Sequence, residues 1–339
     1  MSRPLLVVDH PSGFEHDTGP GHPERAPRLQ AAELAWADPS LSDRVLRRTA
    51  GAATTEDLLR VHSREHVEKI RRITGTGGGR IDADTVTSPA SWEAGLHAAG
   101  AGITAIEAID HDEVDLGFVV VRPPGHHATP HQAMGFCLFN NIAVAARWLT
   151  ARGQRVAVID WDVHHGNGTQ DAFWDDPDVL FVSLHQAGIY PGSGRHDERG
   201  GTSAPWSTLN LPLPARSTGD VYRRAFDGVV RRAVEWHRPD WILVSAGYDA
   251  HRADPLADMA LSDDDFASFT TRLVEMAGGS QVVFFLEGGY DLRALTDSVR
   301  ATALAGLDRP DDAALVTTRG GPGHEVVDVL ARQWEQLGR

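Results

Sequence analysis

The sequence predicts an α/β fold in a single domain, with a mostly parallel β-sheet covered by helices on both faces. Short, nearly continuous apolar runs alternate with longer amphipathic patterns, which is typical of helices connecting parallel strands. The chain has 339 residues, 41% apolar content and a mean hydropathy of -0.28, as expected for a soluble protein with a large core. No long Pro-, Gly- or Ser-rich linker divides it, so we expect residues 1–339 to form one domain.

Six short apolar runs rich in β-branched residues predict the strands. Most are apolar throughout rather than alternating, as expected for strands of a parallel sheet that is buried on both faces. In chain order, the predicted strands are 5–9, 117–123, 155–162, 179–185, 240–247 and 282–289.

Amphipathic patterns with helical spacing lie between and around these runs. Residues 310–323 predict a loop before a C-terminal helix. The predicted helices are 31–37, 63–73, 91–109, 140–151, 220–236, 262–277 and 324–337.

The charge and the cysteine content limit the classes of function. A formal net charge of -15 argues against direct nucleic-acid binding, because affinity for phosphates depends on clustered Lys and Arg. The single cysteine, Cys137, excludes an internal disulfide framework and suits a reducing cytoplasm. The apolar run at the N-terminus is too short for a signal peptide or a membrane span, so no membrane partner is expected. A homo-oligomer is compatible with these features.

The arginine content suggests the origin of the chain. Lys69 is the only lysine among the 32 Lys and Arg residues. Together with abundant Ala and Gly, this favours a GC-rich bacterial genome, but it says nothing about mechanism.

The segment RVAVIDWDVHHGNG, residues 155–168, is the strongest functional signal. Side chains alternate between the two faces of a strand, so Asp160, Asp162 and His164 are expected on one side. Removing these groups from water costs several kcal/mol each unless a cation compensates. No Lys or Arg follows until Arg195, so we expect a divalent metal ion.

Other polar residues follow the carboxyl ends of other predicted strands. His126 and His127 follow the 117–123 run, Asp249 follows 240–247 and Tyr290 follows 282–289. Ligands bind at this edge of open parallel sheets, so the four segments are expected to converge on one active site.

A catalytic zinc ion commonly has three protein ligands and an open position for water, whose pKa it lowers towards about 7. Asp162, His164 and Asp249 would supply these ligands. One of the paired histidines, His126 and His127, would transfer protons during hydrolysis.

Two further residues are expected to support this chemistry. Asp160 would orient His126 from the same strand face as the metal ligands. Tyr290 follows two glycines, and its hydroxyl could donate to the oxyanion of a tetrahedral intermediate. A tyrosine after a Gly-Gly turn is as often a core residue, so Tyr290 alone is no proof of a site.

From about residue 10 to residue 305, the chain resembles the zinc-dependent histone deacetylase superfamily. The likeness is to its class II-like branch, which includes bacterial histone deacetylase-like amidohydrolases and acetylpolyamine amidohydrolases. The matching segments are HDTGPGHPERAPRL, VRPPGHHA, GFCLFNN, VAVIDWDVHHGNGTQ, FVSLHQ, YPGSG, VSAGYDAHRADPL and LEGGY.

The resemblance implies an arginase/deacetylase-type fold with about eight strands. It assigns the zinc ligands to Asp162, His164 and Asp249, proton transfer to His127, the electrostatic partner to His126 and the oxyanion donor to Tyr290. It further implies a substrate tunnel walled by Gly135, Phe136 and Tyr190, with Leu256 beside it, and a rim carboxylate at Asp84. A structural potassium ion would bind main-chain oxygens of Asp160, Asp162, His164 and Leu184 and the side chains of Asp160 and Ser183.

Three positions separate branches of the superfamily. Asn167 stands where class I members have an aspartate, so His127 would have a neutral partner. Tyr290 is present where a nearly inactive eukaryotic subgroup has histidine. Leu256 is apolar where the polyamine-selective eukaryotic member has an acidic gatekeeper, which weakens a polyamine interpretation.

The leading hypothesis is an amidohydrolase that removes acetyl groups from acetyl-lysine in proteins or peptides. The first alternative keeps the mechanism and takes acetylpolyamines as substrates. An arginase-like hydrolase with two metal ions and an inactive module that binds acyl-lysine are two further alternatives. Ferrous iron accepts the same nitrogen and oxygen ligands, so the ligand types do not distinguish it from zinc.

Overall fold

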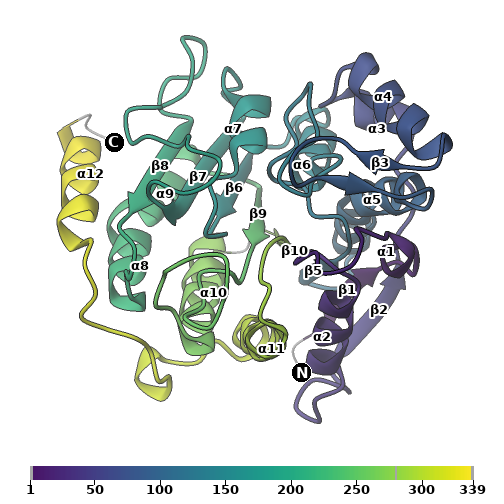
Figure 1. Cartoon of the computed structure of the whole chain (residues 1–339). Helices are drawn as coiled ribbons and strands as arrows, with labels where there is room; N and C mark the ends of the chain where they lie inside the picture. Colours follow the sequence, from purple (N-terminus) through teal and green to yellow (C-terminus); the bar gives the residue numbers. More distant parts are fainter. Residues whose placement is uncertain (1–2, 279–280, 337–339) are drawn as a thin grey trace.

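The computed structural model describes residues 3–278 and 281–336. In this part of the chain, one sheet of eight parallel strands has the order β2-β1-β5-β10-β9-β6-β7-β8 (Figure 1). The expected α/β class and parallel eight-stranded sheet are confirmed. Its strands are β1 (Leu5–Asp9), β2 (Val45–Thr49), β5 (Leu116–Val120), β6 (Val156–Asp160), β7 (Val179–Gln186), β8 (Thr208–Leu213), β9 (Trp241–Ala246) and β10 (Gln281–Leu286). A separate antiparallel hairpin pairs β3 (Gly79–Arg80) with β4 (Val86–Thr87).

Alternate side chains of each central strand enter two different cores. In β6, Ala157 and Ile159 belong to one buried cluster, whereas Val156 and Val158 belong to the other. This two-sided burial explains why the predicted strands are apolar throughout. In Figure 1, α3 to α6 lie in the right half of the picture together with β1 and β2, whereas α8, α9 and α12 lie in the left half together with β7 and β8.

Helices cover both faces, as predicted. One face packs against α2 (Pro27–Trp36), α8 (Gly219–Ala225), the π-helical turn η1 (Phe226–Val230), α9 (Arg231–His237), α10 (Asp263–Ala277), α11 (Leu292–Asp308) and α12 (His324–Gln336). The other face packs against α3 (Thr55–Leu59), α4 (Arg64–Gly75), α5 (Ser91–Asp110), α6 (Asn141–Thr150) and α7 (Asn167–Phe173). Short helical turns also occur at α1 (Ser12–Glu15) and η2 (Asp312–Ala314).

Both edge strands were missing from the predicted strands. β2 has the sequence VLRRT and is largely exposed, so it lacks the apolar signal. β8 has the sequence TLNLPL, in which an asparagine and a proline interrupt the apolar residues. The faces of β2 are poorly covered at its edge of the sheet, whereas β8 is largely buried although its sequence contains polar residues.

Several predicted boundaries were wrong by a few residues. The strand predicted for 155–162 ends at Asp160, and that for 117–123 ends at Val120. The helix predicted for 220–236 is interrupted by the π-helical turn η1, and the long helix α11 was not predicted. The 310–323 segment contains the single turn η2, and residue 337, the predicted end of the last helix, lies outside the described residues.

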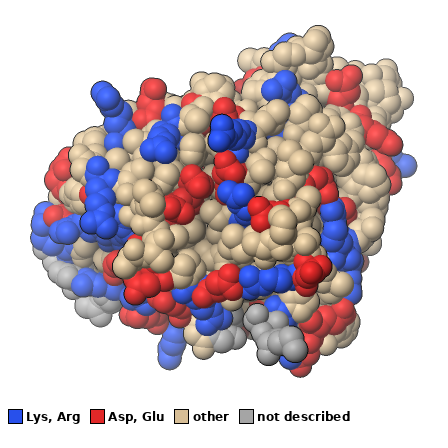
Figure 2. Space-filling model, turned by 90° about the horizontal axis from the view of Figure 1, so that it is seen from below, with Lys and Arg blue, Asp and Glu red and all other residues tan. Residues whose placement is uncertain are grey.

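No helix within the described ranges combines the length and apolar character needed to cross a bilayer. On the face presented in Figure 2, acidic and basic side chains are interspersed. This distribution gives no support there to an extended basic surface for phosphate binding.

Candidate active site

Asp162, His164 and Asp249 lie together at the carboxyl edge of the sheet, in the loops after β6 and β9. One ligand atom from each residue lies within 4.8 Å of the other two. His164 Nδ1 is 3.3 Å from Asp162 Oδ1 and 3.1 Å from Asp249 Oδ2. Both aspartates are buried. Two buried carboxylates therefore converge on one partly exposed imidazole.

The alternation predicted for this segment persists beyond the end of β6. Trp161 and Val163 are fully buried in the apolar core, whereas Asp162 and His164 face the cluster. Asp160, which precedes these four residues, is the last residue of β6. The polar side chains are thus held in place by the two apolar residues packed between them.

Backbone contacts fix the two carboxylates. Asp162 Oδ2 accepts a hydrogen bond from Gly288 N at 2.7 Å, and Asp249 Oδ1 accepts one from Val163 N at 2.9 Å. A Cβ atom at Gly288 would overlap oxygens of both aspartates, and one at Gly247 would overlap Asp162. These glycines are required because the backbone passes directly against the carboxylates.

His126 is oriented by two acidic residues. Its Nδ1 lies 2.9 Å from Asp160 Oδ2, the contact predicted for this pair. Glu287 Oε2 accepts hydrogen bonds from the backbone N–H groups of Gly125 at 2.7 Å and His126 at 3.2 Å. Burial alone would lower the pKa of His126, but the charges of Asp160, Asp162 and Glu287 raise it to about 10. His126 is therefore held as a cation in this arrangement.

His127 has the opposite protonation preference. Its Nδ1 lies 2.9 Å from Asn167 Oδ1, an amide oxygen that can only accept, so the proton lies on Nδ1. Burial and the neighbouring His126 and His164 lower the pKa of His127 well below its usual value. Its Nε2 therefore keeps a free lone pair, as a general base requires.

Arg28 contacts both the backbone just before Tyr290 and the ring of Tyr290. Arg28 Nε donates to the carbonyl of Gly289 at 2.7 Å, and Arg28 Nη2 donates to the carbonyl of Glu287. The guanidinium carbon of Arg28 lies 5.0 Å from the centre of the Tyr290 ring. Burial raises the pKa of Tyr290 well above its usual value, so the phenol remains a hydrogen-bond donor.

Arg28 belongs to a buried charge cluster behind the site. Glu24 pairs with Arg28 at 3.3 Å and with Arg122 at 2.8 Å. Burial alone would raise the pKa of Glu24, but the two guanidinium groups lower it to about 2. Arg122 also donates to the carbonyls of Gly13 at 2.6 Å and His16 at 3.1 Å. The cluster thereby ties the N-terminal segment to the loop that follows β5.

A cavity of about 200 Å³ opens above these residues. The rings of Tyr190 and His127, which both line this cavity, meet edge-on with their centres 5.1 Å apart. All the residues predicted for the tunnel and its rim line this one cavity. They are Asp84, Gly135, Phe136, Tyr190 and Leu256, with His127, His164 and Tyr290.

Gly135 and Phe136 form a narrow turn in the cavity wall. Both have positive φ angles, +56° and +69°, in the left-handed region that most side chains avoid. A Cβ atom at Gly135 would overlap the imidazole of His127. The Phe136 ring lies 6.0 Å from that of Tyr290, across the cavity. The turn therefore brings an aromatic wall next to both predicted catalytic groups.

The donor set fits a divalent cation. Burial would lower the pKa of His164, but its contacts with Asp162 and Asp249 raise it to about 10, so the cluster strongly attracts positive charge. A metal ion could replace this proton between the same carboxylates. Two carboxylate groups and one imidazole are ligands that zinc and ferrous iron both accept.

Several supporting residues were not predicted. Glu287 and Asp254 are buried acids in the loops that carry Tyr290 and Asp249. Glu287 directly follows the buried strand β10, which is the signal that identified the other site residues, whereas Asp254 lies eight residues after the end of β9. Glu24, Arg28 and Arg122 could be identified only from the structure, because their contacts join distant parts of the chain.

The comparisons with known proteins place these features in a family context. The sequence model of the histone deacetylase domain matches residues 22–305. The solved HDA15 HD domain is similar with a TM-score of 0.89 and 33% identity, over 99% of each chain.

Curated relatives come from plants, archaea and bacteria. "Histone deacetylase 10, chloroplastic" from Oryza sativa subsp. japonica is 43% identical over 77% of this chain, which spans 63% of the rice protein. A "Probable deacetylase" from Archaeoglobus fulgidus is 36% identical over 89% of this chain and 86% of its own. A "Histone deacetylase-like amidohydrolase" from Pseudomonas aeruginosa is 42% identical over 74% of this chain and 67% of its own.

Proposed function

The chain belongs to the histone deacetylase family, and we propose that it is a metal-dependent amidohydrolase that removes acetyl groups from acetyl-lysine in proteins or peptides. One observation carries this proposal. His164, which lies against Asp162 and Asp249 in the candidate metal cluster, lines the same cavity as His127 and Tyr290. Ligands for a Lewis acid, a proton-transfer group and a hydrogen-bond donor thus meet at one point, as amide hydrolysis requires.

Asp162, His164 and Asp249 would hold the metal ion. When bound, such an ion polarises the amide carbonyl and makes water a better nucleophile at neutral pH. We propose zinc, with ferrous iron as the alternative that the same ligands accept.

The two histidines have different tasks in this proposal. His127 is neutral with a free Nε2, so it accepts a proton from the attacking water and then returns it to the leaving amine. His126 is kept cationic by Asp160 and stabilises negative charge that develops beside it. The neutral partner Asn167 keeps the proton on His127 Nδ1, and it raises the pKa of the ring less than burial, His126 and His164 lower it.

Tyr290 supplies the remaining group. Its protonated hydroxyl donates a hydrogen bond to the oxyanion of the tetrahedral intermediate. The ring of Phe136 contacts that of Tyr290, and the ring of Tyr190 contacts that of His127, in the wall of the cavity. The rings of Phe136 and Tyr190 exclude water from the alkyl chain of the substrate.

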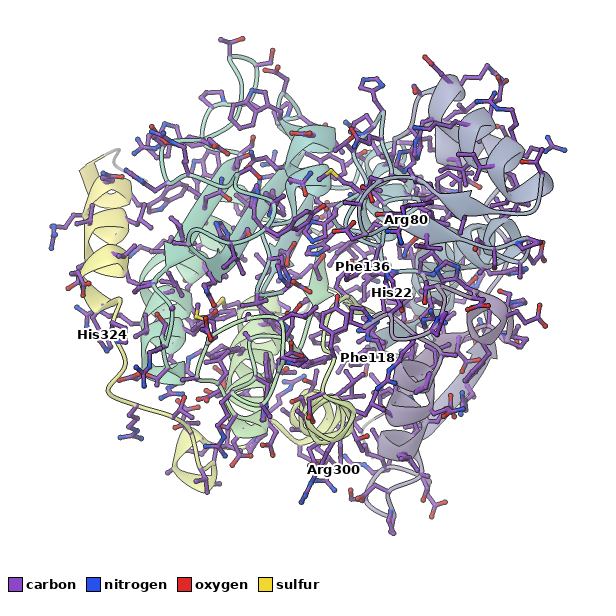
Figure 3. The ribbon with its side chains drawn as sticks, viewed as in Figure 1. His22, Arg80, Phe118, Phe136, Arg300 and His324 are labelled. Atoms are coloured by element: carbon purple, nitrogen blue, oxygen red, sulfur yellow. The ribbon has the colours of Figure 1, made fainter. Side chains whose placement is uncertain are left out.

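A second hollow beside the cavity favours a polypeptide substrate. It has a volume of about 570 Å³, lies between residues 18–23 and the β3–β4 hairpin, and shares Asp84 and Phe136 with the cavity. His22 joins its two walls through a 2.9 Å contact between Nε2 and the Asp84 carbonyl. Figure 3 labels His22, Phe136 and Arg80, which gather around this region. The hollow has room for the residues that flank an acetyl-lysine.

The decisive experiment measures acetate release from an acetyl-lysine peptide. We expect turnover by the wild-type protein that is lost with a chelator and in Asp162→Ala, and is strongly reduced in Tyr290→Phe. Turnover that persists under all three conditions would contradict the mechanism. Peptide binding without acetate release would instead support an inactive acyl-lysine-binding module.

Acetylpolyamines are the second candidate substrates, because the net charge of -15 favours cations. Two residues argue against them: Leu256, which lines the cavity, is apolar, and Arg80 adds positive charge to the neighbouring hollow. We expect kcat/KM for an acetyl-lysine peptide to exceed that for acetylputrescine and acetylspermidine. The reverse order would make the polyamine the substrate while leaving the mechanism intact.

We also propose a structural potassium ion behind the metal cluster, on the basis of the family resemblance. Asp160 and Ser183 are register partners in the sheet, which keeps the two proposed side-chain ligands adjacent. The turn after β6 contacts β7 through a 2.9 Å hydrogen bond from Gln186 N to the Val163 carbonyl. The proposed main-chain ligands are Asp160, Asp162, His164 and Leu184. A cytoplasmic location and homo-oligomerisation remain predictions from the sequence.

A further inference from the structure

Asp254 is a buried carboxylate that joins two loops of the site. It lies between β9 and α10 and is 8% exposed. Its Oδ2 accepts hydrogen bonds from Tyr290 N at 2.6 Å and Asp291 N at 3.3 Å. Its Oδ1 accepts one from Leu256 N at 3.0 Å. One side chain therefore holds the backbone of Tyr290 and that of a residue in the cavity wall.

The segment that precedes Tyr290 has little intrinsic rigidity. Gly288 and Gly289 follow Glu287, the first residue after β10, and Gly289 has a φ angle of +115°. Glycine has the largest backbone freedom of any residue, so the direction of the next side chain depends on external contacts. The orientation of Tyr290 must therefore be set by groups outside this segment.

Those contacts divide into two sets. Arg28 holds the carbonyls of Glu287 and Gly289, before the tyrosine. Among the described residues, Asp254 is the only one whose side chain accepts a hydrogen bond from the backbone N–H of Tyr290. The contact with the backbone of Tyr290 itself is thus made by Asp254, an acid that the sequence analysis did not identify.

A buried carboxylate at position 254 is expected to reduce the stability of the fold. Among the described residues, Asp254 forms no ion pair with a basic side chain, and three backbone N–H groups provide its stabilisation. Burial and the charge of Asp249 raise the pKa of Asp254 to about 7. A buried carboxylate without a cation destabilises the fold, so a function in the site is the better explanation for it.

Resting on the proposed function, we propose that Asp254 is the positioning residue that sets the direction of the Tyr290 hydroxyl and couples it to the cavity wall at Leu256. It does not touch the substrate. It acts through the backbone of the oxyanion donor, whose placement determines how well charge is stabilised in the transition state.

Asparagine at this position provides a sharp test. The carboxylate accepts from N–H groups with both oxygens, whereas an amide has one accepting oxygen and an NH₂ group that cannot accept. Asp254→Asn must therefore lose either the Tyr290 contact or the Leu256 contact while it keeps the size of the side chain. Asp254→Ala loses both.

The kinetic test uses the full-length protein loaded with zinc and an acetyl-lysine peptide. We expect Asp254→Asn to lower kcat by about 10-fold to 100-fold, with KM within about threefold and the bound zinc unchanged. In a Tyr290→Phe background, the same substitution should cost less than about threefold, because the group that it positions is gone. The matched control is Asp176→Asn, which removes a carboxylate that caps Asp178 N at 2.9 Å in the turn before β7. It should leave kcat within about twofold.

Three kinetic results would overturn the inference. They are an unchanged kcat in both Asp254 variants, an equal loss in the Tyr290→Phe background, and a loss of activity that follows a loss of zinc.

Amide hydrogen exchange separates this inference from the proposed function, because it needs no substrate. We expect faster exchange over residues 287–291 in Asp254→Ala than in the wild-type protein, and no change there in Asp176→Asn. Unchanged exchange in Asp254→Ala would overturn the inference even if the enzyme is active. Wild-type protein that does not hydrolyse the peptide would overturn the proposed function, whatever the exchange result.

Discussion

The acidic residues of the candidate site, at the carboxyl edge of the central sheet, differ in burial and in partners from several acidic residues at the amino edge. At the carboxyl edge, Asp160, Asp162, Asp249, Asp254 and Glu287 are all at most 8% exposed, and none of them pairs with Lys or Arg among the described residues. At the amino edge, several acids are more exposed and have arginine partners. Examples are Asp112 and Asp115 with Arg3, Asp176 with Arg147, and Asp308 with Arg44.

This difference shows what the carboxyl edge requires. Exposed ion pairs contribute little to stability because water solvates both partners. Buried carboxylates without basic partners are expensive, and here they can be compensated only by histidines, backbone N–H groups or a bound cation. We therefore propose that the carboxyl edge, unlike the amino edge, binds a cation.

The most damaging change should be removal of a metal ligand. We expect Asp249→Asn to lower kcat/KM by about 10³-fold or more, because the ion supplies several kcal/mol of transition-state stabilisation. Bound zinc, measured by elemental analysis, should fall from one per chain towards none. A variant that keeps its zinc and its activity would break the distinction between the two edges.

Loss of the oxyanion donor should be the next largest effect. Tyr290→Phe is expected to reduce kcat by about 10²-fold to 10³-fold, which corresponds to the removal of one well-placed hydrogen bond. Steady-state kinetics with an acetyl-lysine peptide provide the measurement. Because the phenol is not a metal ligand in this account, the zinc content should not change, and a parallel loss of zinc would contradict its assigned role.

The buried cluster of Glu24, Arg28 and Arg122 sharpens the comparison, because it is buried but has basic partners. The pKa of Glu24 is lowered to about 2 in the folded protein, below its usual value of 4.5. Its ionisation therefore stabilises the fold above about pH 4.5, by roughly 3 kcal/mol, and this contribution is lost as the pH falls towards 2.

Glu24→Gln should accordingly lower the free energy of unfolding by about 3 kcal/mol at pH 7. The difference from the wild-type protein should shrink as the pH is lowered from 4.5 to 2, as measured by denaturant unfolding. Zinc content should be unaffected, since the two arginines already compensate this charge. A stability difference that does not depend on pH would exclude the ion pairs as its source.

The smallest effect is expected at the amino edge. The side chains of Arg3, Asp112 and Asp115 are 43%, 90% and 68% exposed. Arg3→Ala should therefore change the free energy of unfolding by less than about 1 kcal/mol and leave kcat/KM unchanged. A thermal melt and one rate measurement are sufficient, and a loss of activity here would show that the two edges are coupled.

The sequence predicted the carboxyl edge well for a physical reason. Residues such as Asp162, Asp249 and Tyr290 follow buried apolar runs, and parallel strands bring such positions together. The contact of His126 with Asp160 followed from the strand alternation in the same way. The family resemblance added Gly135, Phe136 and Tyr190, whose meeting in one cavity no local pattern could indicate.

Other features depend on contacts between distant segments and could not be predicted. Arg28 holds the carbonyl of Gly289, which is 261 residues away in the chain. The acceptor role of Asp254 depends on a loop that returns from β10. The edge strands β2 and β8 carry too many polar residues for an apolar pattern to reveal them. Periodicity thus predicts the layers, whereas tertiary contacts determine how the site is supported.

The central claim is that the carboxyl edge holds one catalytic divalent ion. Its most direct test is a zinc titration of chelator-stripped protein, with bound zinc and acetate release measured in the same samples. We predict that activity rises from near zero in proportion to bound zinc and stops rising at one equivalent per chain. Full activity in the stripped protein, or activity that requires two equivalents, would contradict the account.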